Sequence, residues 1–232
     1  MTFDGVEVEC VRYMIKTYTE ADLCSNYDKF LTILEKHFSG DRLKRLMHLY
    51  SDKEYGYRVT MAPASAKEHF HNAYPGGYLD HINNVLITSF GVKKLYEIRG
   101  GTIDFTDEEL SFSCIHHDLG KLGDRDQGEY YLPQDSEWHR VNKLEVYKFN
   151  PNLQYMSVTD RALFILQQYG ITCTWKETLA IKLSDGLYHT PNESYLKSYN
   201  PDHELKTTLP YITNWADHMS SRCEYDMWKL EK

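Results

Sequence analysis

Apolar residues recur at intervals of three and four along most of the chain, which is the spacing of the buried face of an α-helix. The clearest run spans about residues 25–50 and contains Phe30, Leu31, Leu34, Phe38, Leu43, Leu46 and Leu49. Ser39-Gly40 interrupts this run, so we expect a break there between two helical pieces. The first two dozen residues have the least regular pattern and are expected to pack loosely.

Turn signals separate several further predicted helices. The stretch 62–77 has two prolines and a Gly-Gly pair and reads as a loop, and a helix over 78–98 should follow and end at Gly100-Gly101. Thr106 and Glu109 have the spacing of a capping box, which predicts a helix from there to Leu119, with Gly120 as its stop. Three more helices are expected at about 157–169, 175–189 and 206–229.

Strand-like alternation is scarce, so the pattern predicts an all-α fold. Residues 121–154 are polar and aromatic and are expected to form a loop with short helical turns. The length of 232 residues suits one domain. We expect its core over about 60–230, with an N-terminal helical extension over about 1–55.

Composition narrows the class of protein further. Hydrophobic residues make up 41% of the chain and charged residues 26%, as in an ordinary globular protein. No apolar run approaches the ~18 residues of a membrane span, and the N-terminal residues do not resemble a secretory signal. The five scattered cysteines predict no disulfide framework and no cysteine zinc site. These features together predict a cytoplasmic protein.

The formal net charge is −8, from 34 acidic and 26 basic residues. Affinity for nucleic-acid backbones comes mainly from Lys and Arg, and the chain has no basic tract. Binding to extended nucleic acid is therefore disfavoured, whereas a small phosphorylated substrate remains compatible.

The candidate chemistry centres on the sequence His116-His117-Asp118-Leu119-Gly120-Lys121. His81 precedes it on the inward stripe of the predicted helix 78–98, and Asp217 follows it on the last predicted helix. Imidazole suits transition metals, and carboxylates also suit Mg²⁺ or Mn²⁺. His81, His117, Asp118 and Asp217 therefore predict a site for one divalent metal. The residues do not distinguish Mn, Mg, Co, Ni, Zn or Fe.

The same residues carry a resemblance to a known superfamily. The segment from His71-Asn72-Ala73-Tyr74 to Gly76-Gly77 and His81 resembles the segment around the first metal ligand of the HD-domain metal-dependent phosphohydrolases. The His117-Asp118 pair and Ala216-Asp217 match the later ligands, and the likeness spans about 71–228. The segments 184–188 and 216–224 also resemble HD proteins common in bacteriophages, so a phage-encoded protein would act in the host cytoplasm.

The resemblance implies an HD-domain helical bundle and a phosphohydrolase. His81, His117, Asp118 and Asp217 would bind the metal, and Lys121 would place a cation against the phosphate. Asp124 is a further candidate, to orient the attacking water, and is equally compatible with a role in a turn. Some single-metal nucleotidases of the superfamily have Glu where this chain has Lys121. Two-metal members use further histidines, and neither His139 nor His189 lies in a His-His motif, so a second metal is not expected.

Several polar residues are candidates for contact with the substrate. They are His71, Lys121, His139, Asp185, Tyr188 and His189. His71, Asp185 and Tyr188 are equally compatible with a role in capping or turns, His139 with packing at a helix edge, and Lys121 with a surface position at a helix end.

The expected activity is cleavage of a phosphate ester of a nucleotide or nucleotide-derived substrate. Alternatives are a 3′–5′ exonuclease, a cyclic-nucleotide phosphodiesterase, or a sensor that keeps the HD scaffold without catalysis. An oxygenase would need two irons and more histidine ligands than we can place. The sequence does not decide the oligomeric state.

Overall fold

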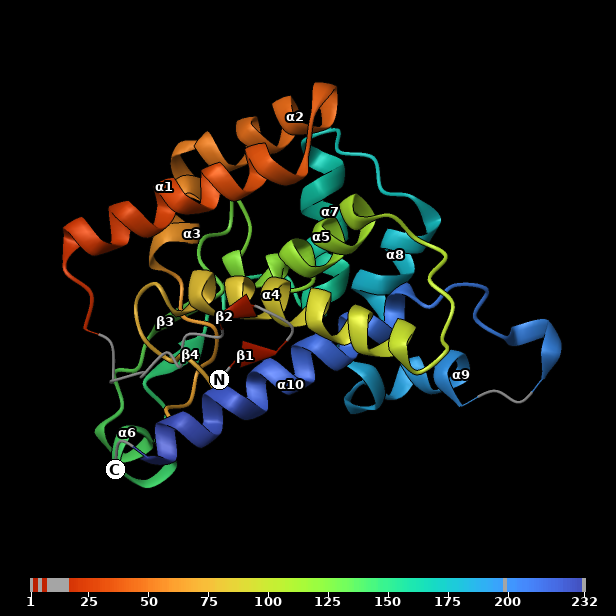
Figure 1. Ribbon diagram of the computed structural model, residues 1–232. Coiled ribbons are helices and arrows are strands. Elements are labelled where there is room, and N and C mark those ends of the chain that lie inside the picture. The colour runs from red at the N-terminus through yellow and green to blue at the C-terminus, as the bar shows by residue number, and fades with distance from the viewer. Residues whose placement is uncertain (1, 4–5, 8–16, 198–199, 231–232) are drawn as a thin grey trace.

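The computed structural model describes residues 2–3, 6–7, 17–197 and 200–230, which are mostly helical (Figure 1). The helices are α1 (Glu20–His37), α2 (Gly40–Ser51), α3 (Lys53–Met61), α4 (Gly77–Ile98), α5 (Asp107–His116), α6 (Glu137–Lys143), α7 (Val158–Gln168), α8 (Trp175–Lys182), α9 (Glu193–Leu196) and α10 (Leu209–Leu230). Two antiparallel pairs of short strands complete them, β1 (Thr2–Phe3) with β2 (Val6–Glu7), and β3 (Tyr131–Pro133) with β4 (Tyr147–Phe149).

The long helices α4 and α10 run side by side through the middle of the molecule, and α5 packs against both (Figure 1). Helices α1 to α3 cover one side of this central group, and α7 and α8 cover another. One hydrophobic core joins them and includes Leu34 of α1, Val85 of α4, Ile115 of α5, Ile165 of α7 and Ile212 of α10. The N-terminal helices therefore share the core of the later ones. None of the described helices combines the length and apolarity needed to cross a membrane.

The predominance of helix confirms the all-α prediction, and several boundaries agree closely. The run 25–50 forms α1 and α2, separated at Phe38 and Ser39. The Thr106 capping box opens α5, with both of its reciprocal hydrogen bonds to Glu109 present. The expectation for the first two dozen residues falls partly on residues outside those that the structure describes.

Several boundaries and segments differ from the prediction. Residues 121–154 contain the β3–β4 pair as well as α6. These strands are too short to show alternation in the sequence. The rings of Tyr130, Tyr131 and Phe149 pack against one another there, edge to face or tilted. Helix α8 ends at Lys182 rather than near 189. There the Ser184 hydroxyl donates to Ile181 O, and Asn214 donates to Ser184 O, so these side chains take carbonyls that a longer helix would use. Helix α10 begins at Leu209 rather than at 206.

The predicted helix to Leu119 also ends early, at His116, and this end shapes the site. The imidazole Nδ1 of His116 lies 2.7 Å from Phe112 O, and that of His117 lies 2.8 Å from Cys114 O. Cys114 O is among the last four carbonyls of α5, so the His117 ring satisfies an acceptor that the helix C-terminus leaves open. The chain continues into the 3₁₀ turn η1 (Leu119–Leu122), where a Cβ on Gly120 would overlap Val158 O. Glycine at this position lets η1 pack directly against the start of α7.

Candidate metal centre

Three elements bring the four predicted ligands together. His81 is on the second turn of α4, His117 and Asp118 follow the end of α5, and Asp217 is on α10. The ligand atoms of His81, His117 and Asp217 all lie within 4.8 Å of one another. Asp118 Oδ2 lies 3.6 Å from the Nε2 atoms of both His81 and His117. This buried group could hold a metal ion, as the sequence predicted.

The tautomer of each histidine decides which of its ring nitrogens can bind a metal. His117 Nδ1 faces Cys114 O, which can only accept, so this nitrogen carries the hydrogen. His81 Nδ1 lies 3.0 Å from the Glu224 carboxylate and donates in the same way. In the neutral form of each ring, Nε2 is then a lone pair directed into the cluster. Neither Nε2 has a hydrogen-bond partner among the described residues.

The lone pairs point at carboxylates rather than at donors. His81 Nε2 lies 3.2 Å from Asp217 Oδ1, and His117 Nε2 lies 3.6 Å from the same atom. Bare lone pairs and anionic oxygens at such distances would repel each other, so each Nε2 either carries a proton, as the raised pKa of both imidazoles indicates, or shares a metal cation with the carboxylates. The donor set of two imidazoles and two carboxylates therefore fits a divalent metal.

The pKa values of these groups reflect an excess of negative charge in the cluster. Burial disfavours a charged imidazole, but Glu224 and Asp217 outweigh it and raise the pKa of His81 to about 10. Burial likewise opposes a charged His117, yet Asp118 and Asp217 raise its pKa. Burial favours the neutral acid at Asp217, and the His117 and His81 imidazoles nevertheless hold its pKa well below the usual range. The carboxylates therefore stay ionised, and the cluster attracts cations.

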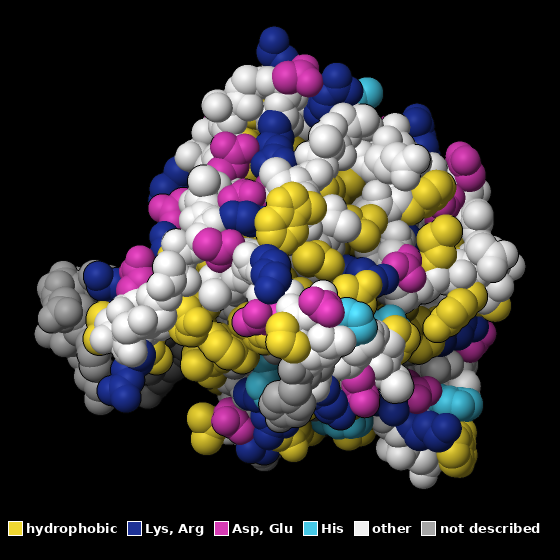
Figure 2. All heavy atoms as spheres, turned by 90° about the vertical axis from the view of Figure 1, so that its right-hand side faces the viewer, with side chains coloured by type: hydrophobic (Ala, Val, Ile, Leu, Met, Phe, Trp, Pro, Cys, Tyr) yellow, Lys and Arg dark blue, Asp and Glu magenta, His cyan; other side chains and the backbone are white. Residues whose placement is uncertain are grey.

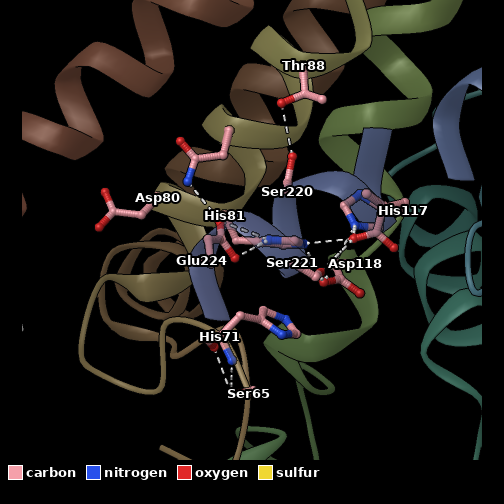
Figure 3. A network of polar contacts seen from close by, with 12 residues as sticks. Ser65, His71, Asp80, His81, Thr88, His117, Asp118, Ser220, Ser221 and Glu224 are labelled. Atoms are coloured by element: carbon pink, nitrogen blue, oxygen red, sulfur yellow. Dashed lines mark hydrogen bonds and ion pairs between the residues drawn. The ribbon is translucent and has the colours of Figure 1, made fainter. Parts of the chain in front are cut away.

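Glu224 is the main residue that sequence reasoning missed. It is buried on α10, and its carboxylate also accepts a hydrogen bond of 2.7 Å from Asn84 on α4. Figure 3 shows His81 between Glu224 on one side and Asp118 with His117 on the other. Glu224 is seven residues after Asp217, or two helical turns, so both lie on one face of α10. That spacing was the available signal.

Lys121 and His71 border the cluster. Lys121 is in η1, and its Nζ donates to Asp118 Oδ2 at 2.6 Å. Burial disfavours its charge, but Asp118 reverses this effect and raises the pKa of Lys121. The His71 ring centroid lies 4.7 Å from that of His81, and ligand atoms of His71, His81 and Asp118 lie within 4.8 Å of one another. Burial and the neighbouring His81 lower the pKa of His71 to about 3. His71 is thus a neutral side chain at ligand distance.

A cleft of about 620 Å³ opens beside Asp217, and we call it the Asp217 cleft. It includes His71, Asp185 and Tyr188 of the predicted substrate contacts. Its other lining residues are His69, Phe70, Ser184, Asn214, His218, Ser221, Arg222 and Tyr225. Among them, the exposed Tyr188 ring stacks on His218 at 5.8 Å between centroids. We call His81, His117, Asp118 and Asp217 the metal cluster, and the cleft borders it at Asp217.

The remaining predicted site residues lie elsewhere. His139 is on α6, where its Nδ1 contacts the N-cap hydroxyl of Ser136 at 2.8 Å. The Asp124 carboxylate accepts hydrogen bonds from the backbone N–H groups of Asp126 and Gln127, so it stabilises a turn. His189 follows the turn 186–188 and is not among the lining residues of the Asp217 cleft. The structure therefore does not join these three residues to the metal cluster.

Comparison with known proteins adds no relative. No protein-family model matches the sequence, and neither a curated protein nor a solved structure matches it.

Proposed function

We propose that this protein is a metal-dependent phosphohydrolase of the HD-domain type, acting on a phosphate ester of a nucleotide or nucleotide-derived substrate. One observation carries the proposal: two imidazole Nε2 atoms and two carboxylates converge, at the edge of a cleft, in a cluster that could hold a metal ion. The order His81, His117-Asp118, Asp217 is also the ligand order of the resemblance described above. His81, His117, Asp118 and Asp217 would be the ligands.

A divalent metal held by these residues supplies a bound water of lowered pKa and polarises a phosphoryl oxygen. The chain contributes the rest. Glu224 orients His81, and Cys114 O orients His117, so both Nε2 atoms are fixed before a metal arrives. Because few side chains must reorganise, the ligand geometry is preorganised.

Lys121 is the cation of the site. Its Nζ contacts Asp118 at 2.6 Å, and the lysine side chain is only 13% exposed. A charge held in a buried environment acts on a phosphoryl group more strongly than one in water. Lys121 would therefore offset the negative charge that develops on the phosphoryl oxygens.

The Asp217 cleft is the proposed substrate site. Arg222 lines it and lies with its guanidinium carbon 5.1 Å from the centroid of the Tyr225 ring. Tyr188 and His218 present stacked rings at the same cleft. A phosphate at the metal, a cation at Arg222 and flat rings beyond it suit a nucleotide.

A polymeric nucleic acid suits this surface less well. On the face drawn in Figure 2, Lys and Arg side chains are interspersed with Asp and Glu and form no continuous basic surface. Together with the net charge of −8, this distribution favours a small substrate.

The test is release of phosphate or nucleoside from a panel of mono-, tri- and cyclic nucleotides, with Mn²⁺, Mg²⁺, Co²⁺ or Ni²⁺. We expect turnover with at least one metal, and a loss of about a thousandfold in His117→Ala and Asp118→Ala, since charge stabilisation by a metal is worth several kcal/mol. His203→Ala and Asp126→Asn are matched controls, because both residues are exposed.

The panel also separates the alternatives. Turnover of cyclic nucleotides alone would indicate a phosphodiesterase. Bound metal and bound nucleotide without turnover would overturn the proposal and indicate a nucleotide sensor.

A further inference from the structure

Arg161, near the start of α7, is a buried arginine that no carboxylate balances. The residue is 2% exposed, and it forms no ion pair with any described residue. Its Nη2 donates to Gln154 O at 2.5 Å, and its Nε has no acceptor in the part of the chain that the structure describes. A guanidinium remains charged throughout the working pH range, and a buried charge is destabilising unless it is paired. The environment of Arg161 therefore lacks an anion.

Arg161 lines a cavity of about 340 Å³, which we call the Arg161 cavity. It lies between α7, the end of β4 and the loop that joins them, and its walls include Tyr130, Phe149, Asn150 and Tyr155. This volume is in the range of sites for small molecules. None of the metal-cluster residues lines it.

The walls of the cavity are held in place by the fold. The Asn150 side chain donates to Gln127 O and Glu129 O, at 3.4 and 2.8 Å, and its own Oδ1 accepts from the backbone of Asn152. These bonds fix the end of β4 against the segment that precedes β3. The cavity therefore exists without a ligand to shape it.

Aromatic rings lie at the opening. Phe149 is 61% exposed and Tyr155 is 87% exposed, and Phe149 meets Tyr130 edge to face at 5.4 Å between centroids. Exposed rings of this kind stack on nucleobases. The planar guanidinium fork matches the oxygens of a phosphate. The cavity therefore suits a ligand with an anionic group at its buried end and a flat ring at its open end.

We propose that the Arg161 cavity is a second, metal-independent site that binds the phosphate group of a nucleotide, with the base against Phe149 and Tyr155. Tyr130 lines this cavity and also a smaller one, of about 190 Å³, that contains Lys121. Tyr130 thus lines both the proposed nucleotide site and a cavity beside the metal cluster. The proposal goes beyond the proposed hydrolase and does not depend on it.

The test is calorimetric binding of AMP, inorganic phosphate and adenosine to the metal-free protein in EDTA. We expect AMP to bind at least tenfold more tightly than either fragment. Arg161→Met should weaken AMP binding at least tenfold, because the guanidinium fork that pairs with phosphate is lost. The AMP affinity of Arg161→Lys should lie between those of the parent and Arg161→Met. Arg140→Gln is the matched control, since Arg140 is exposed and pairs with Glu137 on α6. His117→Ala should bind AMP as the parent does, which separates this site from the metal cluster.

A second measurement covers the case in which Arg161→Met does not fold. Tyr155→Trp adds a tryptophan at the opening to the four that the chain already contains. AMP should change the emission of this variant, beyond any change in the parent, with the affinity found by calorimetry. Unchanged emission, or equal AMP affinity in the parent and Arg161→Met, would overturn the proposal. Phosphate that binds as tightly as AMP would overturn the assignment to a nucleotide and indicate free phosphate as the ligand.

Discussion

His81 donates its Nδ1 hydrogen to the carboxylate of Glu224 across 3.0 Å, and this contact fixes the nitrogen that faces the metal cluster. The two residues are on α4 and α10, the helices that run side by side through the molecule. Asn84, one turn after His81, binds the other carboxylate oxygen at 2.7 Å. The central helix pair is thus joined by the same contact that prepares a candidate ligand.

Glu224→Gln should weaken divalent-metal binding by about 10- to 100-fold, the usual effect of removing a group that orients a metal-bound histidine. Glutamine replaces one of the two carboxylate oxygens with an NH2 group, which cannot accept the His81 hydrogen, and it also lacks the negative charge. Isothermal titration with Mn²⁺ measures the change, with Glu204→Gln as an exposed control. Unchanged affinity in a folded Glu224→Gln variant would show that this contact does not orient a ligand.

Metal should stabilise the folded protein. A ligand present at a hundredfold excess over its Kd adds about 2.7 kcal/mol to the free energy of unfolding. For a chain of this length the melting temperature should rise by about 5–10 °C over that in EDTA. Scanning calorimetry of the parent and of Asp217→Asn tests this effect, and the variant should show no rise. An equal rise in both proteins would place the metal elsewhere.

The buried His116 should make stability depend on pH. Its Nδ1 donates to Phe112 O, and the rings of Phe38, Tyr50 and Phe112 surround it. Burial lowers the pKa of His116 from 6.5 to about 3 in the folded state. Between these values the unfolded chain binds a proton that the folded chain does not, so stability falls as the pH decreases. The expected slope is about 1.4 kcal/mol per pH unit.

Urea unfolding of the parent and of His116→Gln from pH 7 to pH 4 measures this contribution. The glutamine can still donate to Phe112 O but does not titrate, so the variant should lose stability less steeply by about that slope. His203→Gln, at an exposed position, should follow the parent. Parallel profiles for the parent and His116→Gln would contradict the prediction.

Arg42 and Glu177 form the ion pair that ties α2 to α8. Two nitrogens of the guanidinium lie 2.7 and 2.8 Å from the two carboxylate oxygens, and Glu177 is fully buried. The carboxylate also accepts the backbone N–H of Thr174 at the start of α8. Glu177→Ala should lower the free energy of unfolding by about 1.5–3 kcal/mol, because the guanidinium loses its buried carboxylate and keeps only Glu108 and Thr172 O as partners.

Chemical denaturation of Glu177→Ala measures that loss. Glu204→Ala removes an exposed glutamate that pairs only with the exposed Lys206, so it should change stability by less than about 1 kcal/mol. Equal stability of the two variants would show that the Arg42–Glu177 pair contributes little.

The sequence predicted most helices because their signals are local. Apolar spacing defined α1 and α2, and the Thr106–Glu109 capping box fixed the start of α5. The early end of α8 was not predictable in this way. It depends on Asn214, which binds Ser184 O from a distant part of the chain. The β3–β4 pair was missed because three-residue strands show no alternation.

The residues of the candidate site were likewise predictable where residue type and order indicate them, and not where helix packing decides their role. Residue type and order indicated His81, His117, Asp118 and Asp217, and the fold brings them together. The role of Glu224 depends on which face of α10 meets α4, and that is a property of helix packing. Asp124 and His139 were plausible by type, but the Asp124 carboxylate caps a turn and the His139 ring contacts the N-cap hydroxyl of Ser136, so both bind their own neighbours in the sequence.

The most direct test of the proposed function combines metal content with turnover in one titration. Metal-free protein is titrated with Mn²⁺ while hydrolysis of the best nucleotide of the panel is followed, with His117→Ala beside it. We expect activity to rise in proportion to added metal, to reach a plateau at one equivalent per chain, and to be absent from the variant. Turnover that persists in EDTA, or a bound equivalent of metal without hydrolysis of any nucleotide, would contradict a metal-dependent phosphohydrolase.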